Sequence, residues 1–320
     1  MKRIGCLCLL LIVLIVPVQV EAQQDEPERG GFFGNIILGG GLAAGRPSPL
    51  EVTDDNEIIN GLDERVEHYS EAIPVIMAEI GYAIVSTGTE ISLGNKSGRT
   101  DLLALAVNQS LDDLGLLRII LSHGYNDVWK DPFLVGVKRD ETNEISSSLE
   151  FDYETILGTG AQLSISGAQI KIDDDQIGIR EPDLKRDGSA ITFGAGYVIA
   201  FNENNVIIPS IGFVVDERNG KSNSSEGYRL ELEHVLGLGK FTFVTNLAFR
   251  ETEFDKIHPI FNLTREEKGY ELSEFITYVE PFGLRGFSIN GLIAYSHVDA
   301  NIRFFESDIL VVGLGVGYSF

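Results

Sequence analysis

Alternation of apolar with polar or small residues is the dominant pattern of the chain from residue 32 to its end. In the last strand-like segment, Leu310, Val312, Leu314, Val316, Tyr318 and Phe320 alternate with Val311, Gly313, Gly315, Gly317 and Ser319. A period of two places the large apolar side chains on one face of a β-strand and the small ones on the other. An apolar face backed by a small face, ending on an aromatic residue, is typical of a strand with lipid outside and a polar lumen inside.

The same alternation recurs along the chain, and helical periodicity is hard to find. It is clear in residues 145–153, 191–199, 228–236 and 241–249. We expect about fourteen strands, with twelve or sixteen as the alternatives. The expected strands lie near residues 32–43, 73–85, 89–94, 101–110, 114–123, 145–156, 161–172, 190–200, 205–215, 227–236, 241–250, 270–280, 286–298 and 309–320.

The segments that connect these strands alternate between short and long. The short ones are residues 86–88, 111–113, 157–160, 202–204, 237–239 and 281–285, and most of the others are long and charged, as in 173–188, 216–226 and 251–269. Short periplasmic turns and long outer loops are typical of outer-membrane barrels. With an even number of strands, the pattern predicts an all-β, transmembrane, antiparallel up-and-down β-barrel over residues 32–320, located in the bacterial outer membrane, with both termini in the periplasm.

A few segments fit this scheme imperfectly. The alternation changes phase around Gly167, which predicts a β-bulge, and Glu274 falls on an apolar face. Residues 133–137 could form a short extra strand, and we interpret them as part of an outer loop over 124–144. The longest segment without strand character, 44–72, is acidic. It is expected either to cover the outer mouth or to fold into the lumen as a constriction.

The N-terminus indicates export. Lys2 and Arg3 precede an apolar run that ends near Val16 and is followed by Val20-Glu21-Ala22. This is the pattern of a signal peptide over residues 1–22, leaving 23–31 as a periplasmic extension. Both cysteines of the chain, Cys6 and Cys8, fall within it. Cleavage would change the formal charge from −23 to −24, which argues against nucleic acid as a partner.

The sequence offers little for catalysis, and we expect no enzyme, cofactor or metal. His123, His234 and His297 fall near strand ends on the apolar face, where an imidazole suits the membrane interface. Adjacent strand residues point to opposite faces, so Ser122 cannot pair with His123; a lipid-hydrolysing site would need a serine and a histidine on neighbouring strands at one height. The acidic segments 173–175 and 54–57 could collect calcium, although neither has the spacing of a known calcium loop.

Charged residues on the inward faces are the strongest candidates for function. Charged groups facing hydrocarbon cost ~2 to 4 kcal/mol for a cation at the bilayer centre, so these side chains belong in a wet lumen. Either they line a conduit, or they pair with each other and with a loop to close it. The set comprises Arg118, Glu150, Asp152, Glu154, Arg229, Glu231, Glu233 and Arg250.

Several stretches resemble an uncharacterised family of Gram-negative outer-membrane β-barrel proteins. They are residues 48–56 with 59–62, 128–136 with 138–142, 149–153, 183–188, 254–261 and 301–305, of which Val128-Trp-Lys-Asp-Pro132 is the most specific. The resemblance implies a barrel in the outer membrane and supplies no reaction or ligand. Trp129, Asp131, Pro132 and Arg139 form an outer-loop motif whose composition suggests an ordered loop.

These patterns predict a porin-like outer-membrane channel, expected to be a monomer, for transport of small solutes with a preference for cations. The alternative is a surface barrel with a blocked lumen whose outer loops bind a partner. A lipid-modifying enzyme or a transporter of hydrophobic substrates is less favoured. Besides lipid, the expected partner is the barrel-assembly machinery, which would bind the C-terminal strand through Tyr318 and Phe320.

Overall fold

The computed structural model describes residues 30–63, 68–95 and 102–320. The predicted signal peptide and residues 23–29 of the predicted extension lie outside the described residues. Most of the described chain is β-strand, and every pairing between the strands is antiparallel. In the part of the chain that the structure describes, no helix has the length and apolar character needed to cross a bilayer.

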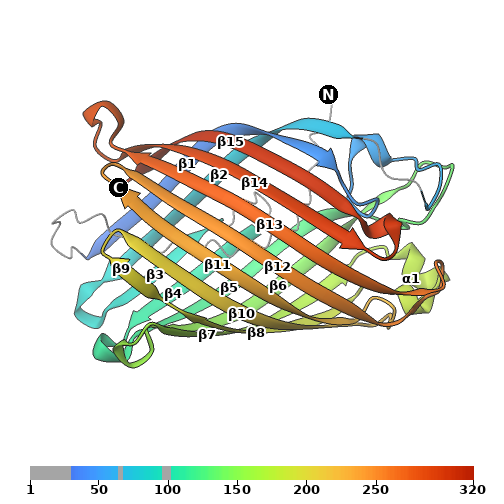
Figure 1. Cartoon of the computed structure of the whole chain (residues 1–320), viewed down its shortest axis with the longest axis horizontal. Coiled ribbons are helices and arrows are strands. Elements are labelled where there is room, and N and C mark those ends of the chain that lie inside the picture. The colour runs from blue at the N-terminus through green and yellow to red at the C-terminus, as the bar shows by residue number, and fades with distance from the viewer. Residues whose placement is uncertain (1–29, 64–67, 96–101) are drawn as a thin grey trace.

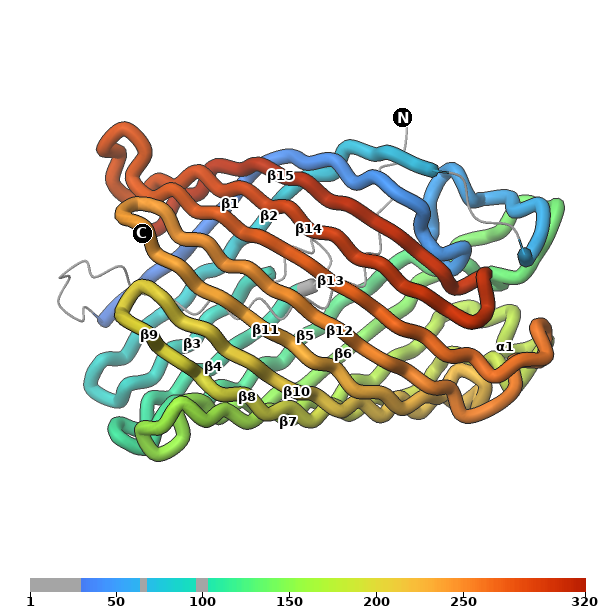
Figure 2. Tube along the Cα trace, viewed as in Figure 1, coloured from blue at the N-terminus to red at the C-terminus, as the bar shows by residue number. Residues whose placement is uncertain are grey.

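The strands close into one barrel, whose strands tilt in a common sense (Figures 1 and 2). Each strand pairs with its neighbours in sequence, β15 pairs with β1, and β10 pairs with β11, so the described strands form a closed ring. β8 and β9 are two parts of one strand interrupted at Val198, and both pair with β10. The fourteen-stranded up-and-down barrel predicted from the alternation is therefore confirmed. The strands are β1 Gly31–Arg46, β2 Tyr69–Ile84, β3 Thr89–Gly94, β4 Leu102–Ser110, β5 Leu116–Trp129, β6 Glu141–Glu154, β7 Ala161–Ile172, β8 Gly188–Tyr197, β9 Ile199–Asn202, β10 Asn205–Arg218, β11 Ser225–Leu238, β12 Phe241–His258, β13 Leu263–Val279, β14 Phe287–Ala300 and β15 Ser307–Ser319.

The two ends of the barrel differ. Short turns and the C-terminus lie together at one end, on the left in Figure 1, which we call the turn end. The longer connections, including the helix α1 (Gln176–Arg180), gather at the other end, which we call the loop end. Single 3₁₀ turns occur at Asp54–Asn56, Val85–Thr87, Asp112–Leu114, Ile156–Gly158, Pro182–Leu184, Pro281–Gly283 and Arg303–Phe305.

Several strands extend further toward the loop end than the alternation predicts. β12 and β13 continue through most of the expected loop 251–269, leaving only residues 259–262 as a turn. β5 likewise runs to Trp129, and β2 begins at Tyr69 within the segment expected to lack strands. Beyond the lipid both faces of a strand are polar, so the hydrophobic period disappears while the backbone ladder continues.

The faces of the strands follow the prediction. On β15, Leu314 is 64% exposed and Leu310 is 42% exposed, whereas Ile309 and Val311 are buried. The predicted bulge at Gly167 is wrong, because β7 pairs with β6 and β8 in continuous register through that residue. The apparent change of phase arises because Ile170 points inward and Lys171 outward at the loop end, where no lipid imposes an apolar outer face.

Closure of the barrel requires a glycine at the seam between β1 and β15. Gly39 pairs with Gly315, and a Cβ atom at Gly39 would overlap the backbone carbonyl oxygen of Leu314. We expect Gly39→Val to prevent this pairing and to abolish the folded form, which runs faster than the heated chain in detergent electrophoresis. Gly40→Val is the matched control, because the nearest atom to a Cβ there is 3.9 Å away. Equal folding of both variants would contradict the prediction.

Candidate functional site: a charged lumen under a cap of loops

One group of charged side chains lies on the inward faces of β5 and β6. Arg118 Nη1 lies 3.2 Å from Glu154 Oε1, and Arg118 Nε donates a hydrogen bond to Asn108 Oδ1 at 3.1 Å. Asp152 is directly opposite Arg118 in the ladder and Glu150 follows on the same face. The structure therefore brings together four of the charged residues that the sequence placed inward.

A second group lies on β11, β12 and β13. Arg229 Nη2 lies 2.7 Å from Glu231 Oε1 and 2.8 Å from Glu271 Oε2, so one guanidinium bridges carboxylates on two strands. Sequence reasoning missed Glu271, although its position between the outward residues Tyr270 and Leu272 would have placed it inside. Arg250 is opposite Arg229 in the ladder, and its buried Nε–H donates no hydrogen bond to a described residue.

Glu233 belongs to this second group but forms no salt bridge with a described residue. Its side chain is buried on the inward face of β11, and Oε1 has no hydrogen-bond partner among the described residues. Glu233 therefore adds a carboxyl group to the inward wall that no described side chain neutralises.

An apolar strip on β14, β15 and β1, with Tyr69 and Ile73 of β2, lies between Glu271 on β13 and the inward Glu71 and Glu79 of β2. Ala43, Tyr69, Ala294, Ile309 and Val311 form a packed cluster there, with Ile73 and Leu292 against it. The inward wall is thus charged over part of its circumference and apolar over another part. The sequence hinted at this only through the inward Val311 and the glycines of the last strand.

The loops at the loop end pack together into a unit that we call the cap. It comprises residues 47–63, 130–140, 173–187, 219–224, 259–262 and 301–306. Its hydrophobic core includes Ile177 from the β7–β8 loop and Phe304 from the β14–β15 loop, and these loops start from nearly opposite sides of the ring. A single core that contains both must cross the mouth of the barrel. The other members of this hydrophobic core are Ile59, Phe133, Leu184, Ala300, Ile302 and Phe305. Leu50, Leu62, Ile260 and Phe261 pack against it.

Arg139 and Trp129 of the predicted loop motif anchor residues 47–63 in the cap. Arg139 is fully buried, and its guanidinium donates to the carbonyl oxygens of Pro49, Asn56 and Pro132. The guanidinium carbon lies 4.4 Å from the centre of the Trp129 ring, and Trp129 Nε1 donates to the Glu51 carbonyl at 3.0 Å. The described part of the long acidic segment therefore lies at the mouth.

Asp131, the remaining motif residue, ties the cap to α1. Its Oδ2 lies 2.5 Å from Arg180 Nη1, while its Oδ1 accepts the backbone N–H of Phe133 at 3.0 Å. Two of the acidic residues in the segment 173–175 that could have collected calcium form ion pairs, Asp174 with Lys130 and Asp175 with Arg186. Within the described ranges, no group of three or more possible ligands is placed to hold a metal ion.

Glu51 gives the cap a dependence on pH. Burial raises the pKa of its carboxyl to about 8, partly offset by a hydrogen bond from the Ser48 backbone. The closed cap thus holds a proton that a released segment, with a pKa near 4.5, loses. Between these two values the contribution of Glu51 to the stability of the closed cap falls as pH rises, and the fall is complete above the higher one.

We therefore expect proteolytic cleavage within residues 47–63 to be faster at pH 8 than at pH 5 after correction for the protease's own pH profile. Glu51→Gln should remove most of this difference, because the amide carries no charge at either pH. Glu57→Gln should retain it, since Glu57 only forms an exposed pair with Lys138. A difference of the same size in all three proteins would contradict the assignment.

The histidines do not assemble into a catalytic group of three. Ser122 points inward and His123 outward, as expected, but His123 Nδ1 lies 2.9 Å from Ser147 Oγ on the neighbouring strand β6. His297 stacks on Tyr270. His234 does not lie near the membrane interface as predicted but midway along the apolar outer face of β11, where it pairs with Asn205.

The aromatic residues of the C-terminal strand lie on the outer face at the turn end. Tyr318 and Phe320 are exposed and stacked, with ring centres 6.2 Å apart, and Phe287 packs against Tyr318. Aromatic belts of this kind sit at the membrane–water interface. Binding of this strand by the assembly machinery stays a prediction.

The barrel is similar in architecture to solved outer-membrane proteins. These include the outer-membrane channel DcaP of Acinetobacter baumannii, with 10% identity over 91% of this chain and 97% of that chain and a TM-score of 0.46. A FadL homologue of Pseudomonas aeruginosa has 9% identity over 90% of each chain and a TM-score of 0.41. An anion-selective porin from Comamonas acidovorans has 10% identity over 91% of this chain and 100% of that chain, with a TM-score of 0.43. Likeness at this level carries no information about a solute.

Comparison of sequences identifies the family of the chain. No protein of curated function matches it. A family described as protein of unknown function, DUF2860, matches residues 31–319, which span the barrel from β1 to β15. This protein of the outer membrane, with its closed fourteen-stranded barrel, belongs to the DUF2860 family.

Proposed function

We propose that the protein is a channel through which small solutes cross the outer membrane, with a preference for cations. The observation that carries the proposal is the arc of inward charges on β5, β6 and β11 to β13, in which carboxylates outnumber guanidiniums. A barrel of fourteen strands is wider than the side-chain-filled interior of an eight-stranded barrel. Carboxylates in a confined aqueous path raise the local concentration of cations and repel anions.

The apolar strip, which adjoins the charged residues of β13, narrows the class of solute. A solute that carries a positive charge and an apolar part can face the carboxylates and the strip at once, whereas a bare inorganic ion can use only the carboxylates. We therefore favour small organic cations as the solutes. The cap, at the loop end, faces the cell exterior in this proposal and restricts entry.

Conductance in planar bilayers tests the proposal. Refolded protein should give discrete openings, and the reversal potential across a salt gradient should have the sign for cation selectivity. Absence of openings in any salt, both for the native protein and for a variant with a released cap, would reject a channel. Blockade of the current by an organic ammonium ion at lower concentration than by a sugar of similar size would support the solute class.

A second candidate function follows from the cap itself. Its hydrophobic core crosses the mouth, as a permanently closed barrel that binds a partner through its loops would require. The two candidate functions predict different effects of releasing the cap on conductance and on partner binding. A channel conducts more when the cap is released, and a closed surface barrel loses its partner without gaining conductance.

We do not propose catalysis by His123 and Ser147. A nucleophile and base need a third group to orient the base, and His123 Nε2 has no hydrogen-bond partner in the described part of the chain. We expect no hydrolysis of phospholipid acyl esters by the purified protein in mixed micelles, and no difference between the native protein and Ser147→Ala. Hydrolysis that disappears in Ser147→Ala while the barrel stays folded would overturn this expectation.

A further inference from the structure

One arginine on the inner wall of the barrel has no acidic partner. Arg250 of β12 forms no ion pair and no hydrogen bond with a described residue. A guanidinium stays charged throughout the physiological pH range, so its charge needs a partner from the lumen. Four other arginines on the inward strand faces each pair with a carboxylate: Arg118 with Glu154, Arg218 with Asp216, Arg229 with Glu231 and Glu271, and Arg265 with Glu267.

The backbone of β13 positions the Arg250 side chain. Gly269 is opposite Arg250 in the ladder, and a Cβ atom at Gly269 would overlap the Cγ, Cδ and Nε atoms of Arg250. The side chain therefore lies flat across β13, where Nε is buried. The terminal nitrogens Nη1 and Nη2 stay accessible and donate no hydrogen bond to a described residue. They present a fork of N–H donors to the lumen.

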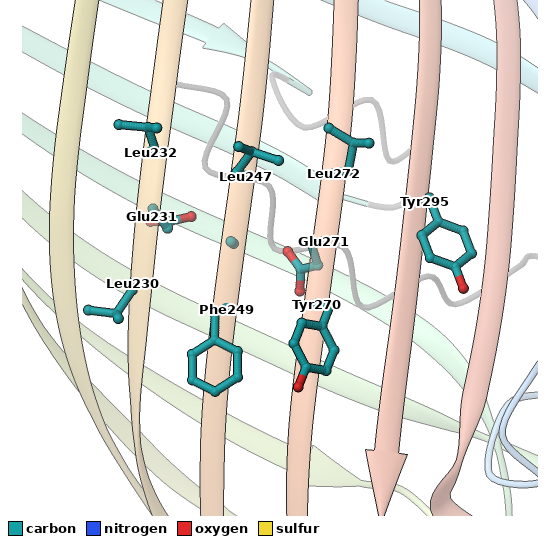
Figure 3. A pocket seen from close by; sticks show the side chains of 10 residues that line it. Leu230, Glu231, Leu232, Leu247, Phe249, Tyr270, Glu271, Leu272 and Tyr295 are labelled. Atoms are coloured by element: carbon teal, nitrogen blue, oxygen red, sulfur yellow. The ribbon is translucent and has the colours of Figure 1, made fainter.

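An excess of carboxylate lies beside this guanidinium. Arg229 alone neutralises both Glu231 and Glu271, so this group of three carries one negative charge more than it balances. Figure 3 shows the two glutamates on either side of β12, and both are opposite Ala248 in the ladder. They are diagonal neighbours of Arg250, at a separation typically of ~7–8 Å. The wall thus offers one unpaired positive charge and one surplus negative charge side by side.

We propose that this part of the wall binds solutes that carry an ammonium group and a carboxylate on one short carbon chain, as amino acids and betaines do. The proposal rests on the channel function proposed above and narrows its solutes to organic cations that also carry an acidic group. The solute carboxylate meets the fork of Arg250, a geometry that guanidinium groups favour. The ammonium group meets Glu231, whose side chain is 27% exposed, whereas that of Glu271 is 7% exposed.

The apolar strip continues the site on the next strand. Val298 of β14 is opposite Gly269, and Ala294 and Leu292 of the strip lie further along the same inward face. An apolar substituent on the solute can rest against this face while its charges are held on β11 and β12. A simple anion would meet the surplus carboxylate, and a simple cation would meet Arg250. Only a solute with both charges matches the whole site.

Two probes that differ in the carboxylate test the proposal. Glycine betaine and choline share a trimethylammonium group, and both keep a fixed charge that prevents leakage through lipid. Their initial rates of entry at low concentration are measured in proteoliposomes that contain refolded protein. In Arg250→Gln the entry of betaine should fall about tenfold, as expected for loss of hydrogen bonds to a charged group. The entry of choline should stay the same or rise, because a positive charge has left the wall.

Three further variants separate the site from general effects on the lumen. Arg250→Lys keeps the charge without the fork and should show an intermediate rate for betaine. Gly269→Ala displaces the guanidinium and should slow betaine severalfold, although no charge changes. Arg285→Gln, in the exposed turn between β13 and β14, is the matched control and should leave both rates unchanged. Heat-modifiable mobility in electrophoresis verifies that each variant is folded.

The outcomes distinguish this site from the channel itself. If both probes enter and their ratio is the same in the native protein and Arg250→Gln, the site is wrong and the channel stands. If neither probe enters faster than into protein-free liposomes, both in the native protein and after release of the cap by Arg139→Ala, the channel is rejected and the site with it.

Discussion

Replacing Arg139 with alanine is expected to raise the conductance of the barrel more than any other single change. The guanidinium satisfies carbonyl groups on two segments of the cap and packs on Trp129. Its removal leaves those buried carbonyls unpaired, and breaking such a site costs about 3–5 kcal/mol. Residues 47–63 then lose their anchor, so openings in planar bilayers should become longer and more frequent.

The matched control is the adjacent Lys138→Ala. Lys138 Nζ lies 2.9 Å from Glu57 in a pair that is largely exposed, so its loss should leave the conductance unchanged. Protease cleavage within 47–63 reports whether the cap has been released, independently of conductance. If Arg139→Ala releases the cap and conductance stays at zero, the lumen is closed below the cap and the channel proposal fails.

Neutralising two lumen carboxylates is expected to produce the second large effect, a loss of cation preference. Asp152 and Glu233 are suited to this test, because neither forms a salt bridge with a described residue. Asp152→Asn with Glu233→Gln replaces two inward carboxyl groups with amides of the same shape, while Arg118, Arg229 and Arg250 stay. The reversal potential across a salt gradient should move toward the value for anions, with a severalfold fall in the permeability ratio.

The control for this change is Glu203→Gln in the exposed turn between β9 and β10. It removes a negative charge outside the lumen, and salt screens its effect on the pore over about 10 Å. The native protein and Glu203→Gln should share one reversal potential. A shift in the double variant no larger than that of the control would show that the carboxylates do not face the permeant ions.

Most of the barrel could be predicted from the sequence because lipid imposes a strict period on each strand. Leu310 through Tyr318 alternate with small residues, and the structure places the two sets outside and inside as predicted. The predicted strand ends were less accurate beyond the part of each strand that faces lipid. β12 continues to His258 on backbone pairing alone, and no side-chain pattern records that continuation.

The candidate site was predictable in part for the same reason. Alternation placed Glu231 and Arg229 inside, but only the register between β11, β12 and β13 brought Glu271 to Arg229. The cap was not predictable beyond the suggestion of an ordered loop at Trp129. Its core joins Ile177 to Phe304, residues far apart in sequence with no periodicity between them.

The sequence by itself determined that the chain forms a barrel, which face of each strand meets lipid, and that the lumen is charged, because these follow from the repeating contact of each strand with two solvents. Only the tertiary structure decided which strands stand opposite one another. That arrangement closes the mouth with loops from both sides of the ring and brings Glu271 to Arg229. Both are consequences of ring closure and strand register, which bring distant residues together without leaving a local pattern in the chain.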